Sequence, residues 1–286
     1  MKKLKKFIVL ALALAMVLSL SACGSFEANI LKGAKKMQEL ESLHMDLTAE
    51  VGIDVGIMGQ EMPIDLKISN SADIQTSPER ILMEIGAHMA GESQSIYLYV
   101  EQEDGSYSAA SSFNGKSWHK EDTSYLEIPE VAEKIDPKAT IALLAKYGSN
   151  FEKACTENVL GYDTIRYDGV ITSEDLMEAV DLISVAQLAG AEIDLSEEDL
   201  AEIKDALKGP YSVPCSIWLE GKSGMIIRYD IDLTEMAGAV IGPILAEEFA
   251  DTDADILGEK IEVRNLKLTT SFSQFDQIGE IQRPEF

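Results

Sequence analysis

Cys23 is the residue whose type and position most directly suggest chemistry. It follows small residues at 21 and 22 and an uninterrupted apolar stretch, residues 7–18, which is itself preceded by four lysines. A positive start, an apolar run and small residues before a cleavage point are the order found in a secretory signal. A cysteine at this point would become the first residue after cleavage. Its thiol could then carry an acyl group.

The sequence Leu20-Ser21-Ala22-Cys23 resembles the lipobox of bacterial lipoproteins. The resemblance implies a signal peptide over residues 1–22, cleavage before Cys23, and a palmitate-type diacylglycerol on the thiol, with an N-acyl group as an optional addition. No other cofactor is expected. The alternatives are an ordinary signal peptide with an incidental cysteine, or a short membrane anchor. The apolar run is shorter than the roughly 20 residues of a spanning helix, which argues against the anchor.

Two acyl chains hold a protein on a membrane stably, whereas one chain holds it only marginally. We therefore expect an extracytoplasmic protein, lipid-anchored to the outer face of the cytoplasmic membrane. Residues 23–29 would be the lipidated cysteine and a short tether, and residues 30–286 a single domain.

The mature chain is strongly acidic. Removal of the leader removes four lysines and no acid, which takes the formal net charge from −26 to −30. Nucleic acid is excluded as a partner, because phosphate binding needs a basic surface. The charge also argues against an electrostatic grip on anionic lipid head groups. A solvated acidic surface is the interpretation we favour.

Two cysteines remain beyond Cys23, at positions 155 and 215. An exported pair can oxidise, but two distant cysteines do not establish a disulfide. Cys215 shares an alternating apolar face with Val213 and Ile217, which favours a buried free thiol. Pro214 lies in the same run and suggests an edge strand, because proline cannot donate to a ladder.

Motifs for catalysis are incomplete. Gly-Lys-Ser occurs at 115–117 and 221–223, but the glycine that a phosphate-binding loop needs five places earlier is absent at both sites. Ser117 lacks a nucleophile elbow around it. His44, His88 and His119 are scattered without neighbouring ligands, so we expect surface or cross-strand histidines rather than a metal site. The sequence therefore predicts a protein that is not an enzyme.

The acidic stretch 251–262 partly matches a calcium loop. Asp251, Asp253, Asp255 and Glu262 occupy ligand positions, but Ile256 stands where the sharp turn requires glycine. We interpret the stretch as a solvated acidic loop without metal.

Alternation of apolar and polar residues dominates the mature chain. From residue 45 to 57 every odd position is apolar, which predicts a long strand with one apolar face. The expected strands are 45–57, 64–68, 81–89, 96–100, 107–113, 151–156, 162–170, 213–219, 225–233 and a final strand that contains 261–270. Short turn-rich connections between one-faced strands indicate an antiparallel sheet.

Helical spacing of apolar residues interrupts this pattern. The expected helices are 30–42, 136–147, 173–190, 196–208 and 236–245. In the final strand the apolar parity changes between Val263 and Leu266. This change predicts a β-bulge near Asn265.

Four short patches resemble the LolA/LolB and LppX/LprG superfamily of lipid-binding lipoproteins, particularly its uncharacterised Gram-positive branch. They are Ala34-Lys35-Lys36-Met37 with Leu43-His44-Met45-Asp46; Tyr97-Leu98-Tyr99 with Gly115-Lys116-Ser117-Trp118; Val159-x-Gly161-x-x-Thr164-x-x-Tyr167-x-Gly169; and Ile217-Trp218-Leu219 with Phe272-Ser273-x-Phe275 and Ile281-x-x-Pro284. The resemblance implies an α+β fold in which a strongly curved antiparallel β half-barrel has its concave face covered by helices.

The function we expect is that of a cell-surface lipoprotein that binds a lipid or other hydrophobic molecule in a cavity between sheet and helices. It would carry or present this ligand without chemistry, and it would contact the membrane through the lipid anchor. The candidate lining residues come from the apolar parity of the strands. They are Leu47, Val51, Ile53, Leu66, Ile68, Met83, Ile85, Leu98, Met225 and Ile227.

Two alternatives stay open. In the first, the same residues form a closed core and the acidic surface, including residues 197–207, engages another envelope protein in an interaction or sensor module. The second is a hydrolase, which would need a nucleophile–base pair or a metal cluster, and neither is visible in the sequence.

Overall fold

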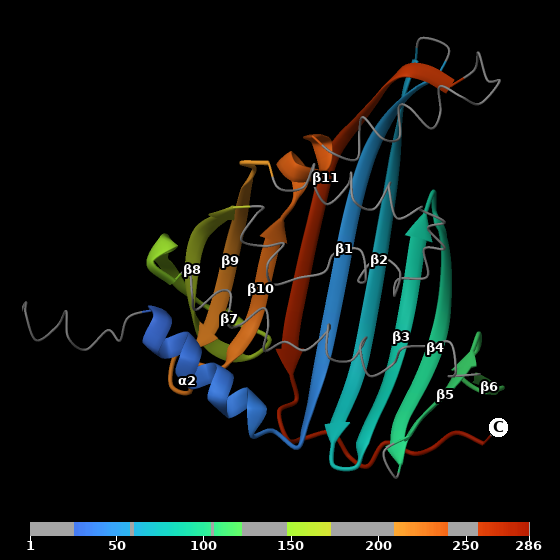
Figure 1. Ribbon diagram of the computed structural model, residues 1–286, viewed down its shortest axis with the longest axis vertical. Helices are drawn as coiled ribbons and strands as arrows, with labels where there is room; N and C mark the ends of the chain where they lie inside the picture. The colour runs from blue at the N-terminus through green and yellow to red at the C-terminus, as the bar shows by residue number, and fades with distance from the viewer. Residues whose placement is uncertain are drawn as a thin grey trace, which may run out of the picture.

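The computed structural model describes residues 26–57, 60–103, 106–121, 148–172, 209–239 and 257–285. These residues form one eleven-stranded antiparallel sheet with the order β6-β5-β4-β3-β2-β1-β11-β10-β9-β8-β7 (Figure 1). The strands are β1 (Ser42–Ile57), β2 (Gln60–Thr76), β3 (Glu79–Met89), β4 (Glu92–Glu103), β5 (Ser106–Ser112), β6 (His119–Glu121), β7 (Phe151–Val159), β8 (Tyr162–Thr172), β9 (Ser212–Glu220), β10 (Ile226–Asp232) and β11 (Leu257–Ser273). β6 and β7 end this order, so the sheet is open.

Every predicted strand is present, and most are longer than predicted. β2 covers residues 60–76 and not only the predicted 64–68; the prediction stopped short because the inward Asn70 interrupts the apolar alternation on which it depended. β6 was not predicted, since three residues are too few to show a period.

The main described helix, α2 (Phe26–Gln38), begins four residues earlier than the expected helix start. Residues 234–239 are also helical, which agrees with the start of the helix expected at 236–245. The helices expected at 136–147, 173–190 and 196–208 lie outside the described residues. The antiparallel sheet of the predicted fold is therefore confirmed, and the cover of helices over its concave face stays a prediction.

One register runs through the sheet and separates an apolar face from a polar face. Across β1, β2 and β3, Val51 lies opposite Leu66, which lies opposite Met89. The bulge predicted near Asn265 is confirmed, because Asn265 pairs with Gly52 while Val263 pairs with Ile53, which leaves Arg264 as the extra residue. Because of the bulge, the apolar side chains of β11 on both sides of Asn265 lie on the same face of the sheet as those of β1.

The largest buried cluster lies where α2 packs across β7–β10. Phe26 stacks on Phe151 with ring centroids 4.8 Å apart and lies 4.9 Å from Tyr167. The helix approaches the β9–β10 turn so closely that a Cβ at Gly33 would lie 1.7 Å from the carbonyl oxygen of Gly224. Only glycine fits at position 33. The helix is therefore held firmly against this end of the sheet.

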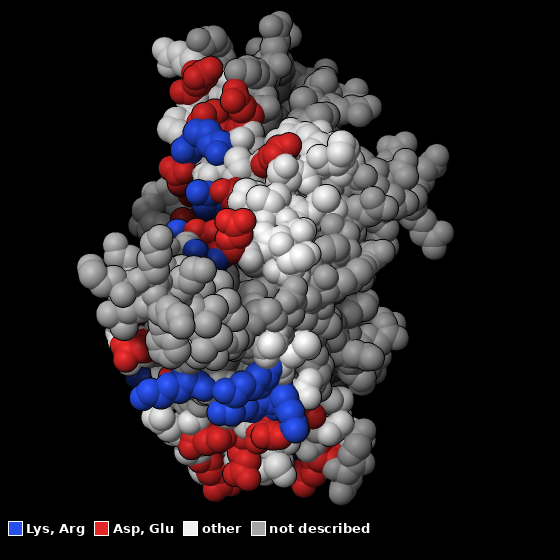
Figure 2. Space-filling model, turned by 90° about the vertical axis from the view of Figure 1, so that its left-hand side faces the viewer, with Lys and Arg blue, Asp and Glu red and all other residues white. Residues whose placement is uncertain are grey.

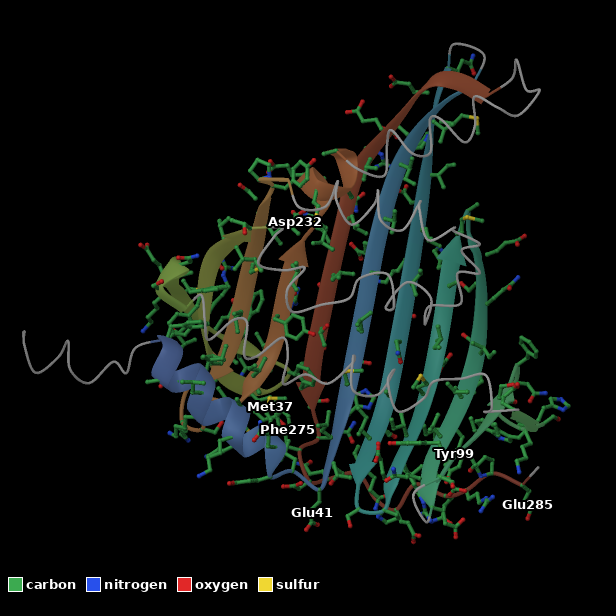
Figure 3. All side chains as sticks on the ribbon, in the orientation of Figure 1. Met37, Glu41, Tyr99, Asp232, Phe275 and Glu285 are labelled. Carbon is green, nitrogen blue, oxygen red and sulfur yellow. The ribbon has the colours of Figure 1, made fainter. Side chains whose placement is uncertain are left out.

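The C-terminal segment, residues 274–285, crosses the ends of β1–β4 (Figure 1). The carboxylate of Asp276 accepts hydrogen bonds from the backbone N–H groups of Glu41 and Ser42 at 2.7 and 3.3 Å. Further along, Arg80 donates to the carbonyl oxygen of Ile281 at 2.9 Å. Phe275 is buried near Met37 of α2, in the same apolar cluster (Figure 3). The segment thus links both halves of the sheet.

The prediction that Pro214 marks an edge strand is wrong. β9 lies between β8 and β10, and Pro214 pairs with Val170 of β8. The ladder to β10 ends at Cys215, so no residue of β10 stands opposite Pro214 on that side. A missing N–H at this position costs no bond to β10.

The prediction of free thiols is confirmed: Cys155 is half-buried and Cys215 is buried, and neither forms a disulfide. Burial raises the pKa of the Cys215 thiol to about 12. A thiol with such a pKa stays protonated and unreactive at neutral pH. Cys215 therefore acts as a small apolar core residue.

Candidate functional site: an apolar sheet face on β1–β4

The apolar face of β1–β4 brings most of the predicted lining residues into one continuous surface. Val51 of β1 lies opposite Leu66 of β2, and Met83 of β3 lies opposite Leu98 of β4. We call this surface the apolar face; its side chains are Leu47, Val51, Ile53, Leu66, Ile68, Met83, Ile85, Ile96 and Leu98. These side chains are half-buried.

The other two candidates lie elsewhere. Ile227 is completely buried in the α2 cluster, and Met225 packs against that cluster just before β10 begins. Leu98 packs against a small second cluster around Val100 and Ala109. The remaining candidates pack against neither buried cluster of the described residues. Sequence parity assigned all of them to one face, but it could not distinguish a closed core from an apolar surface with room for a ligand.

The apolar face continues to exposed side chains at one end. Met62 and Ile64 at the start of β2 and Met89 at the end of β3 are 49, 40 and 53% exposed. Val55 lies opposite Met62, and Ile53 lies opposite Ile64, so these residues extend the same rows. Exposed apolar side chains that continue a half-buried row are typical of a surface that meets a partner or ligand.

Asn70 is the polar exception within the apolar face. It lies opposite Leu47 of β1 and Ile85 of β3. Its amide nitrogen approaches the sulfur of Met83 at 4.0 Å, and its buried side-chain oxygen has no hydrogen-bond partner among the described residues. A buried acceptor without a donor costs about 1–3 kcal/mol. A hydroxyl or amide N–H placed over the apolar face would remove this cost.

The polar face holds the arrangement that comes nearest to a catalytic site. Nδ1 of His44 lies 2.6 Å from Asp73, while Nε2 lies 3.2 Å from Asp46 and 3.4 Å from the hydroxyl of Ser71. The sequence did not indicate this cluster, because the register of β1 on β2 brings His44 and Asp73 together. Its residue types are those of a Ser–His–Asp triad.

The electrostatics of this cluster oppose catalysis. Burial lowers the pKa of His44, but hydrogen bonds and Coulomb attraction from Asp73 and Asp46 outweigh it, so the pKa is raised above 6.5. A carboxylate at each ring nitrogen favours the imidazolium form, in which both nitrogens carry protons and neither has a lone pair to take a proton from Ser71. Within the described residues no group of histidine, cysteine and acidic side chains is arranged to hold a metal ion.

A second polar cluster lies on β7–β10. The guanidinium of Arg228 lies 4.8 Å from the ring centroid of Trp218, and that of Arg166 lies 5.8 Å from it. Each arginine also pairs with an aspartate of its own strand, Asp168 or Asp230, at 2.7 Å. The charges are thus balanced locally. The acidic stretch 197–207, which the interaction-module alternative requires, lies outside the described residues.

Comparison with known proteins finds likeness in structure only. No family model matches the chain, and no curated protein matches it. Among solved structures, the chain is similar to the Mycobacterium tuberculosis lipoprotein LppX, with 13% identity, a TM-score of 0.46, and coverage of 90% of this chain and 98% of LppX. It is also similar to LprF from Mycobacterium bovis, with 12% identity, a TM-score of 0.44, and coverage of 91 and 96%.

The described helices include none that is long and apolar enough to cross a bilayer.

Proposed function

We propose that this chain is a surface-anchored lipoprotein that binds a lipid or other hydrophobic molecule on the apolar face of β1–β4 and carries or presents it without chemistry. The observation that supports this function is the row of half-buried apolar side chains, of which only Leu98 packs against a buried cluster of the described residues. Each methylene that such a ligand buries there contributes about 0.8 kcal/mol. A fatty chain could therefore bind without a charged clamp.

Asn70 suggests where the ligand carries polarity. Its unpaired oxygen lies in the middle of the apolar face, between Leu47 and Ile85. A ligand with one hydroxyl or amide donor along an apolar body would pair this oxygen, and a plain hydrocarbon would leave it unpaired. The ligand class we favour is therefore an acyl lipid with a hydroxyl or amide group.

Membrane attachment is the second part of the proposal. The lipobox-like sequence before Cys23 supports export and diacylglycerol attachment, with the domain outside the cytoplasmic membrane. Mass spectrometry of the mature N-terminal peptide tests this part. A peptide that begins at Cys23 and carries the mass of a diacylglycerol is expected, and an unmodified Cys23 in membrane-derived protein would contradict it.

Ligand binding is tested by native mass spectrometry of gently purified protein and by the melting temperature with added lipids. Val51→Gln places a polar group in the apolar face, so co-purifying lipid and the lipid-induced rise in melting temperature should be lost. Val170→Gln is the matched control, because Val170 lies on the opposite face of the same sheet and is 49% exposed. Absence of bound lipid from the unsubstituted protein, or equal effects of both substitutions, would favour a filled-core interaction module instead.

A further inference from the structure

The outer side of α2 carries a concentration of positive charge in an acidic protein. We define the basic patch as Lys32, Lys35 and Lys36 of α2 together with Lys222 of the β9–β10 turn; all four are exposed. The ammonium group of Lys32 donates to the carbonyl oxygen of Lys222 at 3.0 Å, so turn and helix are neighbours. Figure 2 shows a continuous band of lysine and arginine side chains on this side of the molecule.

The backbone that carries the basic patch is held in place by packing against the sheet. Phe26 and Ile30 on the opposite side of α2 are buried in the largest cluster, with exposed fractions of 5 and 0%. The close approach of Gly33 to Gly224 holds the helix against the turn that carries Lys222. The lysines therefore form a surface of defined orientation.

The patch lies close to the proposed anchor. Only residues 24 and 25 separate Cys23 from Phe26, the first residue of α2. Three peptide steps span at most about 11 Å. A diacylglycerol on Cys23 would thus hold the start of the helix within about 11 Å of the backbone of the acylated residue, near the lipid head groups.

We propose that the basic patch, with the exposed side chain of Leu31, docks α2 on the anionic head groups of the membrane that holds the Cys23 anchor. This inference depends on the anchoring part of the proposed function. Each lysine near an anionic bilayer adds to the attraction, because the surface potential of that bilayer is negative. Leu31, which is 56% exposed on the same side of the helix, would enter the boundary between head groups and acyl chains.

The net negative charge of the chain does not prevent this docking. At physiological ionic strength the Debye length is about 8 Å, so a membrane surface responds mainly to the charges nearest to it. Acidic residues border the patch: Glu27 precedes the lysines in α2, Glu39 and Glu41 follow them, and Glu220 lies at the start of the turn that carries Lys222.

Docking through α2 would orient the sheet. α2 lies across one end of β7–β10, and the far ends of β1 and β2 lie at the opposite end of the molecule (Figure 1). Met62 and Ile64, the exposed continuation of the apolar face, belong to that far end of β2. A docked domain would therefore present the exposed end of its apolar face away from the membrane.

The test uses the mature chain with Cys155→Ser, coupled through Cys23 to a maleimide lipid in vesicles. Chemical coupling makes the result independent of whether Cys23 is acylated in the cell. The vesicles contain phosphatidylcholine alone, or phosphatidylcholine with about 30% phosphatidylglycerol, a fraction chosen to give a clearly negative surface. Limited acetylation followed by mass spectrometry then gives a rate for each lysine.

On the anionic vesicles the acetylation rates of Lys32, Lys35, Lys36 and Lys222 should fall several-fold, and about 0.5 M salt should restore them because it screens exposed charges. Lys116 and Lys120, exposed near the edge strand β6, are internal controls whose rates should not change. Equal rates for the patch lysines on neutral and anionic vesicles would overturn the proposal. So would equal protection of Lys116 and Lys120.

A matched pair of variants separates docking from general charge. Replacing Lys32, Lys35 and Lys36 by glutamine should abolish the protection of Lys222. Replacing Lys67, Lys116 and Lys120 by glutamine changes the net charge by the same amount and should leave that protection intact. If both triple variants lose it, the effect is one of net charge and the basic patch is not the docking surface.

Discussion

The two halves of the sheet have the same alternating sequence pattern but bury it in different ways. In β7–β10 the inward side chains, such as Ile217 and Ile227, are completely buried beneath α2. In β1–β4 the corresponding rows, such as Val51 and Ile85, are half-buried and join neither buried cluster of the described residues. The first half forms the main buried core of the described residues, and the second is the surface on which we propose that the ligand binds.

The difference also shows how each half is held together. β7–β10 are stabilised by packing, whereas β1–β4 depend more on their hydrogen-bonded ladders and on the C-terminal segment. Glu101 is the centre of that attachment: it is 6% exposed and accepts from Tyr99, Ser108 and Arg283 at 2.8, 3.2 and 3.0 Å. Burial and the bond to Glu101 raise the pKa of Tyr99 to about 12, so this phenol remains a donor.

The largest expected effect comes from Ile227→Ala compared with Ile85→Ala. Ile227 is fully enclosed, so truncation should lower the free energy of unfolding by about 4 kcal/mol through lost burial and a residual cavity. Ile85 is half-buried, and the same substitution should cost about 1 kcal/mol or less when no ligand is bound. Urea denaturation of both variants measures the difference. Equal losses would mean that β1–β4 contain a closed core.

The second prediction concerns the C-terminal segment. Glu101→Gln should lower the free energy of unfolding by about 3 kcal/mol, because it removes the buried carboxylate charge with which Arg283 pairs. The matched control is Glu103→Gln: Glu103 lies 3.6 Å from the same Arg283 but is 73% exposed, and its loss should cost less than about 1 kcal/mol.

Amide hydrogen exchange should show faster opening of β3–β5 in Glu101→Gln and little change in β8–β10. Uniformly faster exchange over the whole sheet would contradict the separation of the two halves.

Asn70→Leu should act in opposite directions on stability and on binding. Without ligand it removes an unpaired buried oxygen and should raise the free energy of unfolding by about 1 kcal/mol. The substitution also removes the acceptor for a hydroxyl- or amide-bearing lipid. The affinity for such a lipid should therefore fall about tenfold, which corresponds to the loss of one hydrogen bond. Asn70→Asp is the control, since a buried carboxylate should destabilise the protein. Unchanged affinity in Asn70→Leu would remove Asn70 from the site.

The smallest effect is the pH dependence from His44. Its pKa is raised in the folded protein, so protonation stabilises the fold fully below about pH 6.5, and this contribution is lost as the pH rises through the folded pKa. The size should be below about 1 kcal/mol, because Asp46 and Asp73 are partly exposed. The urea denaturation midpoint should differ less between acidic and alkaline pH in His44→Gln than in the unsubstituted protein. If the difference is the same in both proteins, groups other than His44 cause it.

Much of the sheet could be predicted from the sequence because parity is local information. The apolar rows of β1 and β3 and the bulge at Asn265 follow from alternation alone. β6 and the outer parts of β2 were not predictable in this way, since a short strand or an inward asparagine leaves no period. Pro214 misled the prediction because its effect depends on where the neighbouring ladder ends.

The candidate site could be predicted only as a set of residues that share a face. Whether Ile227 or Ile85 is enclosed depends on where α2 packs, and this is a property of the folded chain. The same holds for His44 with Asp73, which are brought together by strand register, and for Lys32 with Lys222, which lie far apart in sequence. The net charge of −30 expected after removal of the leader argued against contact with anionic lipid, yet the fold brings Lys222 beside the lysines of α2.

The sequence by itself determined which side chains alternate, because strand geometry converts parity into a face, and it predicted Cys23 as an acylation site. Only the tertiary structure decided which part of the apolar face is enclosed, which polar groups meet across strands, and where lysines gather. These outcomes depend on contacts between residues distant in the chain, and no local pattern encodes such contacts.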